Sequence, residues 1–335
     1  MNHREWVSRA VAHEETAVPW NFTFTPPARK KLEGHYGTRH VERTLDFPIR
    51  MGGPNTVKPL YAAPEVYGRV IRDEFGVAWS VHAEDRGSPI GTCLPEPDLS
   101  RYVFPDPLAP WRYEHLAKWT EEHRERYRVL WVGDLWERAT FMRGMEEILL
   151  DVALNRGFVE ALLRGIADCV LQTTETLLTR FEFEAVALSD DYGTQQGLII
   201  SPRDWRLLVK PLLTEIYGLV KRHGRTVFHH TCGNVTEIVG DLIDIGLDIL
   251  HPIQPETMDI RALKRKFGKR LAFCGGVRTQ DLLPTGSPED VRDEVRRLKE
   301  EMGAGGGYIL EPGITLQADV PLANLVALIE EARAG

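Results

Sequence analysis

The sequence predicts an α/β protein of the (β/α)8 TIM-type barrel class, with an N-terminal helix and a proline-rich excursion. Short apolar runs of strand type alternate with amphipathic helical segments along most of the 335 residues. That alternation is typical of parallel strands joined by right-handed crossovers. About eight strands are expected, and this number favours a closed barrel over an open sheet. We expect a single barrel domain over residues 1–335, with the excursion at about 50–115.

Composition argues against several other classes of protein. The chain is 43% hydrophobic with a formal net charge of −8, and no apolar run approaches the length of a membrane span. Acidic charge disfavours a nucleic-acid surface, although a local group of arginines can still hold an anion. Four irregularly spaced cysteines do not suggest a disulfide framework. Because Met1–Trp6 lacks the apolar core of a signal peptide, we expect a cytoplasmic protein. The sequence does not determine the oligomeric state, and a homodimer is possible.

The elements expected before residue 127 include the excursion. In order, they are a helix over 4–14, a strand over 18–24, a helix over about 28–36, a possible strand start near 45, a helix over 67–75, a strand over 77–82 and a polar helix over 111–126. Prolines are frequent between residues 87 and 110, so this stretch is expected to run over the surface.

From residue 128 onward the alternation is regular. Strands are expected at about 128–132, 185–188, 226–230, 248–251, 270–274 and 307–310. Helices are expected over 137–154, 157–181, 201–223, 235–245 and 288–302. Two further helices are expected, one that follows the strand at 248–251 and ends at 267, and one after Pro321. The best-marked helix begins at Ser201, which caps it, with Pro202 at its first position and Asp204 in its first turn.

Polar side chains recur where successive predicted strands end. They are Asp190 and Asp191, then His230 and Cys232, then His251, Gln254 and Glu256, then Cys274, and finally Glu311. Packing of an apolar strand requires none of these at its tip, and barrel enzymes place their chemistry at the C-terminal ends of the strands. The sequence therefore predicts a functional site built from these residues.

His230 and Cys232 are the strongest candidates for metal ligands. Side chains two apart on a strand share a face, and a mixed imidazole and thiolate set suits zinc. Asn234 and Glu237 have the spacing of a capping box and so predict the start of a helix. A helix start at this point would favour the thiolate form of Cys232. Cys274 is the expected third ligand and Glu311 its competitor. A buried thiol with a hydrogen-bonded core histidine explains the His-x-Cys pattern about as well.

The remaining strand-end residues are assigned to acid–base chemistry or to the substrate. Asp190 and Asp191 are the best carboxylates for proton transfer or cation binding, and a loop cap explains one of them equally well. His251 suits a core histidine slightly better than a ligand, while Gln254 and Gln280 offer polar contacts to a substrate. The glycine run 303–307 precedes a strand, so it indicates a turn and not a phosphate-binding loop.

Taken together, several motifs resemble the uroporphyrinogen decarboxylase superfamily nearly end to end. They are Asp190-Asp191-Tyr192-Gly193-Thr194-Gln195 followed by Ser201-Pro202, His230-Thr231-Cys232-Gly233, Gly275-Gly276-Val277 and Gly306-Gly307-Tyr308-Ile309-Leu310. The resemblance implies a (β/α)8 barrel, and it implies one of two activities. True decarboxylases are cofactor-free and bind an acidic tetrapyrrole through an arginine-rich N-terminal segment, which residues 49–53 match poorly.

The other branch contains zinc-dependent methyltransferases that exchange methyl groups with a corrinoid. The chain resembles them at His230 and Cys232, but the stretch Glu311–Ile314 lacks the further cysteine that they usually carry, so Cys274 or Glu311 would have to replace it. The resemblance thus implies a zinc-dependent methyltransferase or demethylase acting on a small-molecule heteroatom, with Asp191 or Glu311 managing the proton. The corrinoid is expected on a separate partner protein. The alternative is a cofactor-free decarboxylase, with Asp191 facing positive charge that develops on the substrate.

Overall fold

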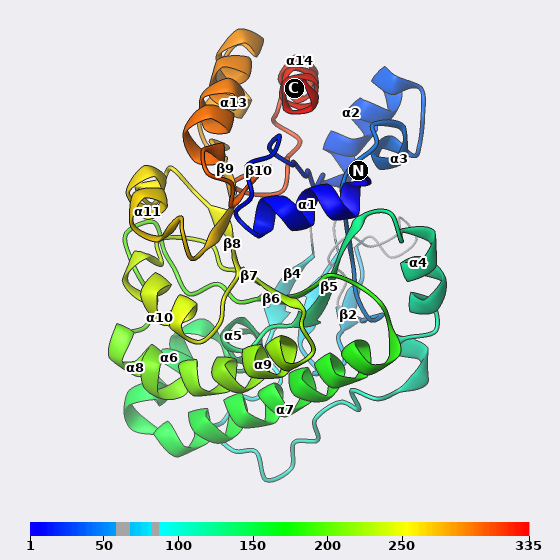
Figure 1. Ribbon diagram of the computed structural model, residues 1–335. Helices are drawn as coiled ribbons and strands as arrows, with labels where there is room; N and C mark the ends of the chain where they lie inside the picture. The colour runs from blue at the N-terminus through cyan, green and yellow to red at the C-terminus, as the bar shows by residue number, and fades with distance from the viewer. Residues whose placement is uncertain (58–67, 82–86, 335) are drawn as a thin grey trace.

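A curled sheet of parallel strands forms the centre of the computed structural model, which describes residues 1–57, 68–81 and 87–334 (Figure 1). The described residues form seven strands in this sheet, in the order β1 (Ile49–Gly52), β5 (Tyr127–Gly133), β6 (Ala185–Ser189), β7 (Thr226–His230), β8 (Ile249–Ile253), β9 (Ala272–Val277) and β10 (Tyr308–Pro312). Every neighbouring pair is parallel. The arrangement is a TIM-like α/β fold, as the sequence predicted.

About eight strands were expected, and the described residues form seven in this sheet, because residues 18–24 do not form a continuous strand. Trp20 and Phe24 make isolated parallel bridges to β10 and to the residues just after it. The ladder between the two bridges is interrupted since Pro312, at the end of β10, has no N–H to donate. The next donor, Gly313 N, bonds to the end of β9 at 3.0 Å. The sheet is therefore a partial barrel with a bridged segment beside β10.

Helices connect and cover the strands. They are α1 (His3–Val11), α2 (Pro26–Tyr36), α3 (Val41–Thr44), η2 (Pro110–Arg112), α4 (Leu116–Glu122), α5 (Trp136–Arg143), α6 (Met145–Leu154), α7 (Arg156–Arg180), α8 (Pro202–Leu208), α9 (Lys210–Arg222), η3 (Thr236–Ile238), α10 (Val239–Asp244), α11 (Ile260–Phe267), α12 (Leu282–Thr285), α13 (Pro288–Gly303) and α14 (Leu322–Arg333). Within the described ranges, no helix combines the length and the apolar character that spanning a bilayer requires.

Several expected helices are shorter or divided. The helix expected over 111–126 is η2 followed by α4. The helix expected over 137–154 is split into α5 and α6 at Gly144, whose φ of 100° lies outside the helical region. The helix that begins after Ser201 is split into α8 and α9 before Pro211, because a proline inside a helix removes a hydrogen bond to the preceding turn.

The excursion contains a small antiparallel sheet of β2 (Val70–Arg72), β3 (Ala78–Ser80) and β4 (Ser88–Gly91). The helix expected over 67–75 is wrong for the residues that are described, and Tyr67 lies outside them. Asp73 explains the difference, because its Oδ1 accepts hydrogen bonds from the backbone N–H groups of Phe75 and Val77, both at 3.0 Å. A side chain that satisfies nearby backbone donors stabilises a turn in place of a helix.

The side chains of the sheet divide between two apolar clusters. On β6, Ala185 and Ala187 belong to the cluster inside the barrel, whereas Val186 and Leu188 face the surrounding helices. The interior cluster also contains Val7, which belongs to α1. In Figure 1 the helix α1 crosses in front of the strands. Backbone bonds join α1 to residues that precede β5 and β10, so α1 covers the N-terminal end of the barrel. The opposite, C-terminal end is left for the polar residues.

Candidate active site

The loops after β6 and β7 are joined along their backbones. Gly193 N donates to Cys232 O at 3.2 Å, and Asn234 N donates to Thr194 O at 2.8 Å. Gly233, with a φ of 80°, lies so close to Gly193 that a Cβ on either residue would meet the other loop at less than 3 Å. Only glycine permits this approach, because any side chain would force the two loops apart. Two loops from different strands are thereby held in a fixed relation.

This joint brings Asp191 to His230 and Cys232. The Nε2 of His230 lies 3.4 Å from Sγ of Cys232 and 3.4 Å from Oδ1 of Asp191. The backbone N–H of Cys232 donates to the same Asp191 oxygen at 2.9 Å. One ligand atom from each of the three residues lies within 4.8 Å of the others. We call Asp191, His230 and Cys232 the β7 cluster.

A second group lies next to it, on the strands β8, β9 and β10. Glu311 Oε2 accepts a hydrogen bond from Sγ of Cys274 at 3.1 Å and lies 3.6 Å from Nε2 of His251. Asn21, from the bridged segment, donates to the other Glu311 oxygen at 3.2 Å. The two groups meet where Nδ1 of His230 lies 2.9 Å from Nδ1 of His251. We call His251, Cys274 and Glu311 the β10 cluster.

The charges of the β7 cluster stabilise one another. Burial alone would lower the pKa of His230, but the charge of Cys232 and the hydrogen bond to Asp191 raise it well above its ordinary value. Burial would likewise raise the pKa of Asp191, yet the hydrogen bond and charge of His230 hold it below its ordinary range. The set thus combines an imidazole, a carboxylate and a sulfur whose electrostatic preferences match.

The β10 cluster is instead dominated by burial. Burial raises the pKa of Glu311 to about 7, against the hydrogen bonds from Cys274 and Asn21. Burial, followed by the charge of Glu311, raises the pKa of Cys274 well above its ordinary value. Burial and the neighbouring His230 lower the pKa of His251 well below its ordinary value. Neutral forms of all three groups are therefore favoured near pH 6.

The β7 cluster fits a divalent ion of the zinc type. Tetrahedral zinc with bonds of about 2.0–2.3 Å separates its ligand atoms by roughly 3.3–3.8 Å. The two 3.4 Å separations around His230 Nε2 lie in that range. Cys274, the third ligand expected from the sequence, falls in the β10 cluster instead, beside Glu311. Asp191 holds the position next to His230 and Cys232.

Hydrogen bonding also fixes how His230 would present itself to an ion. If Nε2 is a ligand, the proton of the ring lies on Nδ1, which then donates to Nδ1 of His251. His251 in turn carries its proton on Nε2, the atom that faces Glu311. A metal-bound histidine normally donates its other N–H to a carboxylate, a backbone carbonyl or water, and here an imidazole nitrogen takes that position. The β10 cluster is thus arranged to orient His230.

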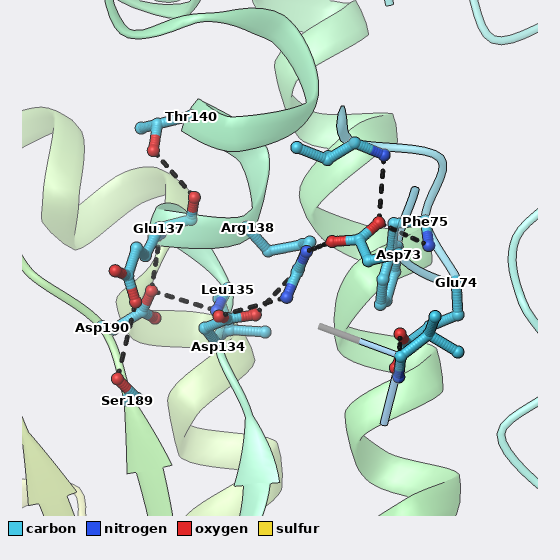
Figure 2. Close-up of polar contacts among 12 residues, drawn as sticks. Asp73, Glu74, Phe75, Asp134, Leu135, Glu137, Arg138, Thr140, Ser189 and Asp190 are labelled. Carbon is cyan, nitrogen blue, oxygen red and sulfur yellow. Dashed lines mark hydrogen bonds and ion pairs between the residues drawn. The ribbon is translucent and has the colours of Figure 1, made fainter. Parts of the chain in front are cut away.

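Asp190, expected at the substrate, lies away from both clusters. It is fully buried, and Figure 2 shows its carboxylate directed at the backbone after β5. One oxygen accepts from Leu135 N at 3.0 Å and from Glu137 N at 2.8 Å, and the other accepts from the hydroxyl of Tyr192 at 2.7 Å. Asp190 therefore positions loops and does not face a ligand.

The two glutamines, expected to contact a substrate, lie in different surroundings. Gln254 is buried; its Oε1 accepts from Gly233 N at 2.7 Å and its Nε2 donates to Gly313 O at 3.1 Å. Gln280 is exposed, and its backbone N–H donates to Glu256 at 3.1 Å. Gln254 supports the loop that carries Cys232, while Gln280 is not brought to either cluster.

The predicted capping box after Cys232 is wrong. Asn234 accepts a hydrogen bond from Thr236 N at 3.1 Å, and the chain then forms the short helix η3 with Val235 as its N-cap. The α-helix α10 begins only at Val239. No helix N-terminus lies directly beside Cys232 in the described chain, so the stabilisation of a thiolate expected from a helix dipole does not apply there.

A cavity of about 450 Å³ opens beside the β7 cluster and is lined in part by His230. Apolar side chains of Phe75, Pro105 and Trp131 form much of its wall, together with the ionic side chains of Arg112 and Arg138. Such a mostly apolar cavity with a few polar groups is typical of a small-molecule site.

Sequence reasoning missed Arg112, Trp131 and Asn21. Asn21 had a detectable signal, since it is a polar residue within the apolar run 18–24. Trp131 was included in a predicted strand, and alternation from Val129 would have placed it inside the barrel. Arg112 had no signal, because it comes from the proline-rich excursion.

Comparisons with known proteins identify the family and the fold of the chain. A profile of the family "Uroporphyrinogen decarboxylase (URO-D)" matches residues 121–335. Uroporphyrinogen decarboxylase of Psychromonas ingrahamii is 25% identical over 248 residues, which are 68% of this chain and 65% of that protein. The methylcobamide:CoM methyltransferase MtaA of Methanosarcina barkeri is 25% identical over 146 residues, 44% of this chain and 40% of that protein. The chain thus spans less than two thirds of the length of each.

Among solved structures, a methyltransferase from Methanosarcina mazei superposes with a TM-score of 0.76 at 16% identity. The superposition covers 99% of this chain and 98% of that one. At this level of identity, the similarity shows a shared fold.

Proposed function

The chain belongs to the uroporphyrinogen decarboxylase (URO-D) family, near its methyltransferase branch, and from that premise we propose a zinc-dependent methyltransferase or demethylase. It would move a methyl group between a heteroatom of a small molecule and a corrinoid carried by a partner protein. The observation that carries this proposal is the β7 cluster, a sulfur, an imidazole and a carboxylate gathered beside a cavity of about 450 Å³.

His230, Cys232 and Asp191 would hold the ion. Zinc, when bound, supplies a Lewis acid for the substrate heteroatom, which makes that atom a better leaving group or, for a thiol, favours thiolate at neutral pH. Asp191 replaces the cysteine that the sequence lacks after Glu311, and the 2.9 Å bond from Cys232 N fixes its carboxylate.

The residues of the β10 cluster would support this site. With the metal on Nε2 of His230, His251 would accept the Nδ1–H of that ring and so fix its orientation. Glu311 Oε2, near both His251 and Cys274, can hold or release a proton close to neutral pH because burial raises its pKa to about 7. Trp131 forms the cavity wall near His230, with ring centroids 6.2 Å apart, and limits access of water.

Metal content tests the proposal. Purified protein should retain zinc in a stoichiometric amount, and Cys232→Ser should lose it while keeping the fold. Cys93→Ser is the matched control, because Cys93 is also half-buried but lies outside both clusters. Equal zinc retention by wild type and Cys232→Ser, or none in the wild type after growth with zinc, would remove the basis of the proposal.

A cofactor-free decarboxylase is the second candidate. It is supported by the match to a uroporphyrinogen decarboxylase over 68% of the chain. Asp191 would then face positive charge that develops on the substrate. A cofactor-free decarboxylase should keep its full activity in a strong chelator. A zinc-dependent methyltransferase should lose its activity under the same conditions.

A further inference from the structure

The charged groups that line the cavity beside the β7 cluster differ in how completely they are paired. Two arginines and two carboxylates contribute to its wall, namely Arg112, Arg138, Glu74 and Asp134. Buried charged groups are normally paired or hydrogen-bonded, since desolvating an unpaired one is costly. A buried donor that lacks a partner inside a cavity therefore indicates where a ligand binds.

Arg138 is fully used by the protein. Figure 2 shows its guanidinium between Asp73 and Asp134. Nη1 donates to Asp73 at 2.7 Å, and Nε donates to Asp134 at 3.0 Å. The ring of Phe75 lies 4.5 Å from its Cζ and covers one face. This guanidinium has little capacity left for a ligand.

Arg112 has that capacity. Its residue is only 9% exposed, yet its Nε has no hydrogen-bond partner in the described part of the chain. Among the same residues, its guanidinium makes one hydrogen bond, from Nη1 to Glu74 at a long 3.3 Å. A guanidinium offers five donors in a planar fork that fits a carboxylate. Nη2 makes no hydrogen bond to the same residues, so this end of the fork is available at the cavity wall, whereas the unpaired Nε is enclosed by protein atoms.

The cavity as a whole suits a flat, mostly apolar molecule. Phe75 and Trp131 offer aromatic surfaces, Pro105 and Pro107 add apolar walls, and His230 lies on the same lining as Arg112. Because Arg112 and His230 line the same cavity, one bound molecule can contact both.

We propose that the cavity takes a small ring-bearing carboxylate whose carboxylate binds Arg112 and whose methylated heteroatom faces His230 and Cys232. This names the substrate class of the methyl-transfer site, and so it rests on the function proposed above. Glu74 offsets part of the Arg112 charge, so it tunes the selectivity for an anion without providing the binding group.

Binding to metal-free protein tests this separately from catalysis. The probes are 4-methoxybenzoate and methoxybenzene, which share the ring and the methyl ether but differ in the carboxylate. Calorimetry in a chelator should show about 10- to 100-fold tighter binding of the acid, as expected for hydrogen bonds to charged groups. Metal retention is measured independently, so failure of the zinc proposal leaves this result interpretable, and the reverse also holds.

Two variants with opposite expected effects sharpen the test. Arg112→Gln should reduce the preference for the acid to nearly none without changing the affinity for methoxybenzene. Glu74→Gln should strengthen binding of the acid several-fold, because Arg112 loses the counter-charge that Glu74 provides, and this variant decides the matter if Arg112→Gln does not fold. The matched control is Arg206→Gln, since Arg206 forms an ion pair with Asp241 on the surface and should leave both affinities unchanged.

Equal affinity of the wild type for the two probes would overturn the proposal. So would an unchanged preference in Arg112→Gln, or weaker binding of the acid in Glu74→Gln.

Discussion

Replacing Gly233 by alanine should separate the loops that form the β7 cluster. The new Cβ would lie 2.8 Å from Cα of Gly193 and closer still to its carbonyl group. The atoms that it meets are backbone, so no flexible side chain can move aside. Relief of the collision must displace the loop of Asp191 from the loop of Cys232.

Two costs add in this substitution. A φ of 80° costs an L-residue about 1–2 kcal/mol, and overpacking costs roughly 1–3 kcal/mol more. We therefore expect the free energy of unfolding to fall by about 2–5 kcal/mol. Zinc retention should fall as well, because the 2.9 Å bond between Cys232 N and Asp191 depends on the same contact.

Gly224→Ala is the matched control. Gly224 also has a positive φ, 66°, but nothing lies within 4 Å of the position that its Cβ would take. The free energy of unfolding of Gly224→Ala should fall only by the cost of the positive φ, about 1–2 kcal/mol. The variant should retain its zinc. Urea unfolding and metal analysis of both variants measure the difference. If Gly233→Ala is no less stable than Gly224→Ala and binds zinc equally, the loop contact does not build the site.

Three further predictions concern buried polar groups. Burial raises the pKa of Glu311 to about 7, so its stabilising contribution is complete below its unfolded pKa and is lost as the pH rises through 7. We therefore compare the free energies of unfolding of Glu311→Gln and the wild type by urea titration in the presence of a chelator. The value for Glu311→Gln should rise relative to that of the wild type by about 3 kcal/mol between pH 4.5 and pH 8. A difference that stays constant with pH would contradict this. Arg138→Met removes the cation between Asp73 and Asp134 and should cost about 3–5 kcal/mol in urea unfolding; a cost below about 1 kcal/mol would show that the carboxylates are neutralised otherwise. Tyr217→Phe removes the 2.7 Å bond to Nδ1 of buried His229 and should cost about 1–3 kcal/mol by the same assay, whereas an unchanged stability would mean that the imidazole finds another partner.

The sequence alone determined which strands carry the polar residues of the site, although His251 and Cys274, expected at strand ends, lie within β8 and β9. The alternation of apolar strands and helices predicted the parallel strands from β5 to β10, and the period of two along a strand predicted a shared face for His230 and Cys232. The predicted elements were wrong where a local contact determined the backbone conformation. The side chain of Asp73 stabilises a turn where a helix was expected, and Pro312 has no N–H to donate to the ladder with residues 18–24.

Only the tertiary structure decided which of these residues meet. Strand register sets His230 beside His251, and the joint between Gly193 and Gly233 brings Asp191 to the β7 cluster, while Cys274 pairs with the strand of Glu311. These are contacts across different strands, and side-chain periodicity within one strand carries no information about register or loop approach. For the same reason, Arg112 reaches the cavity from a segment whose sequence gives no sign of it.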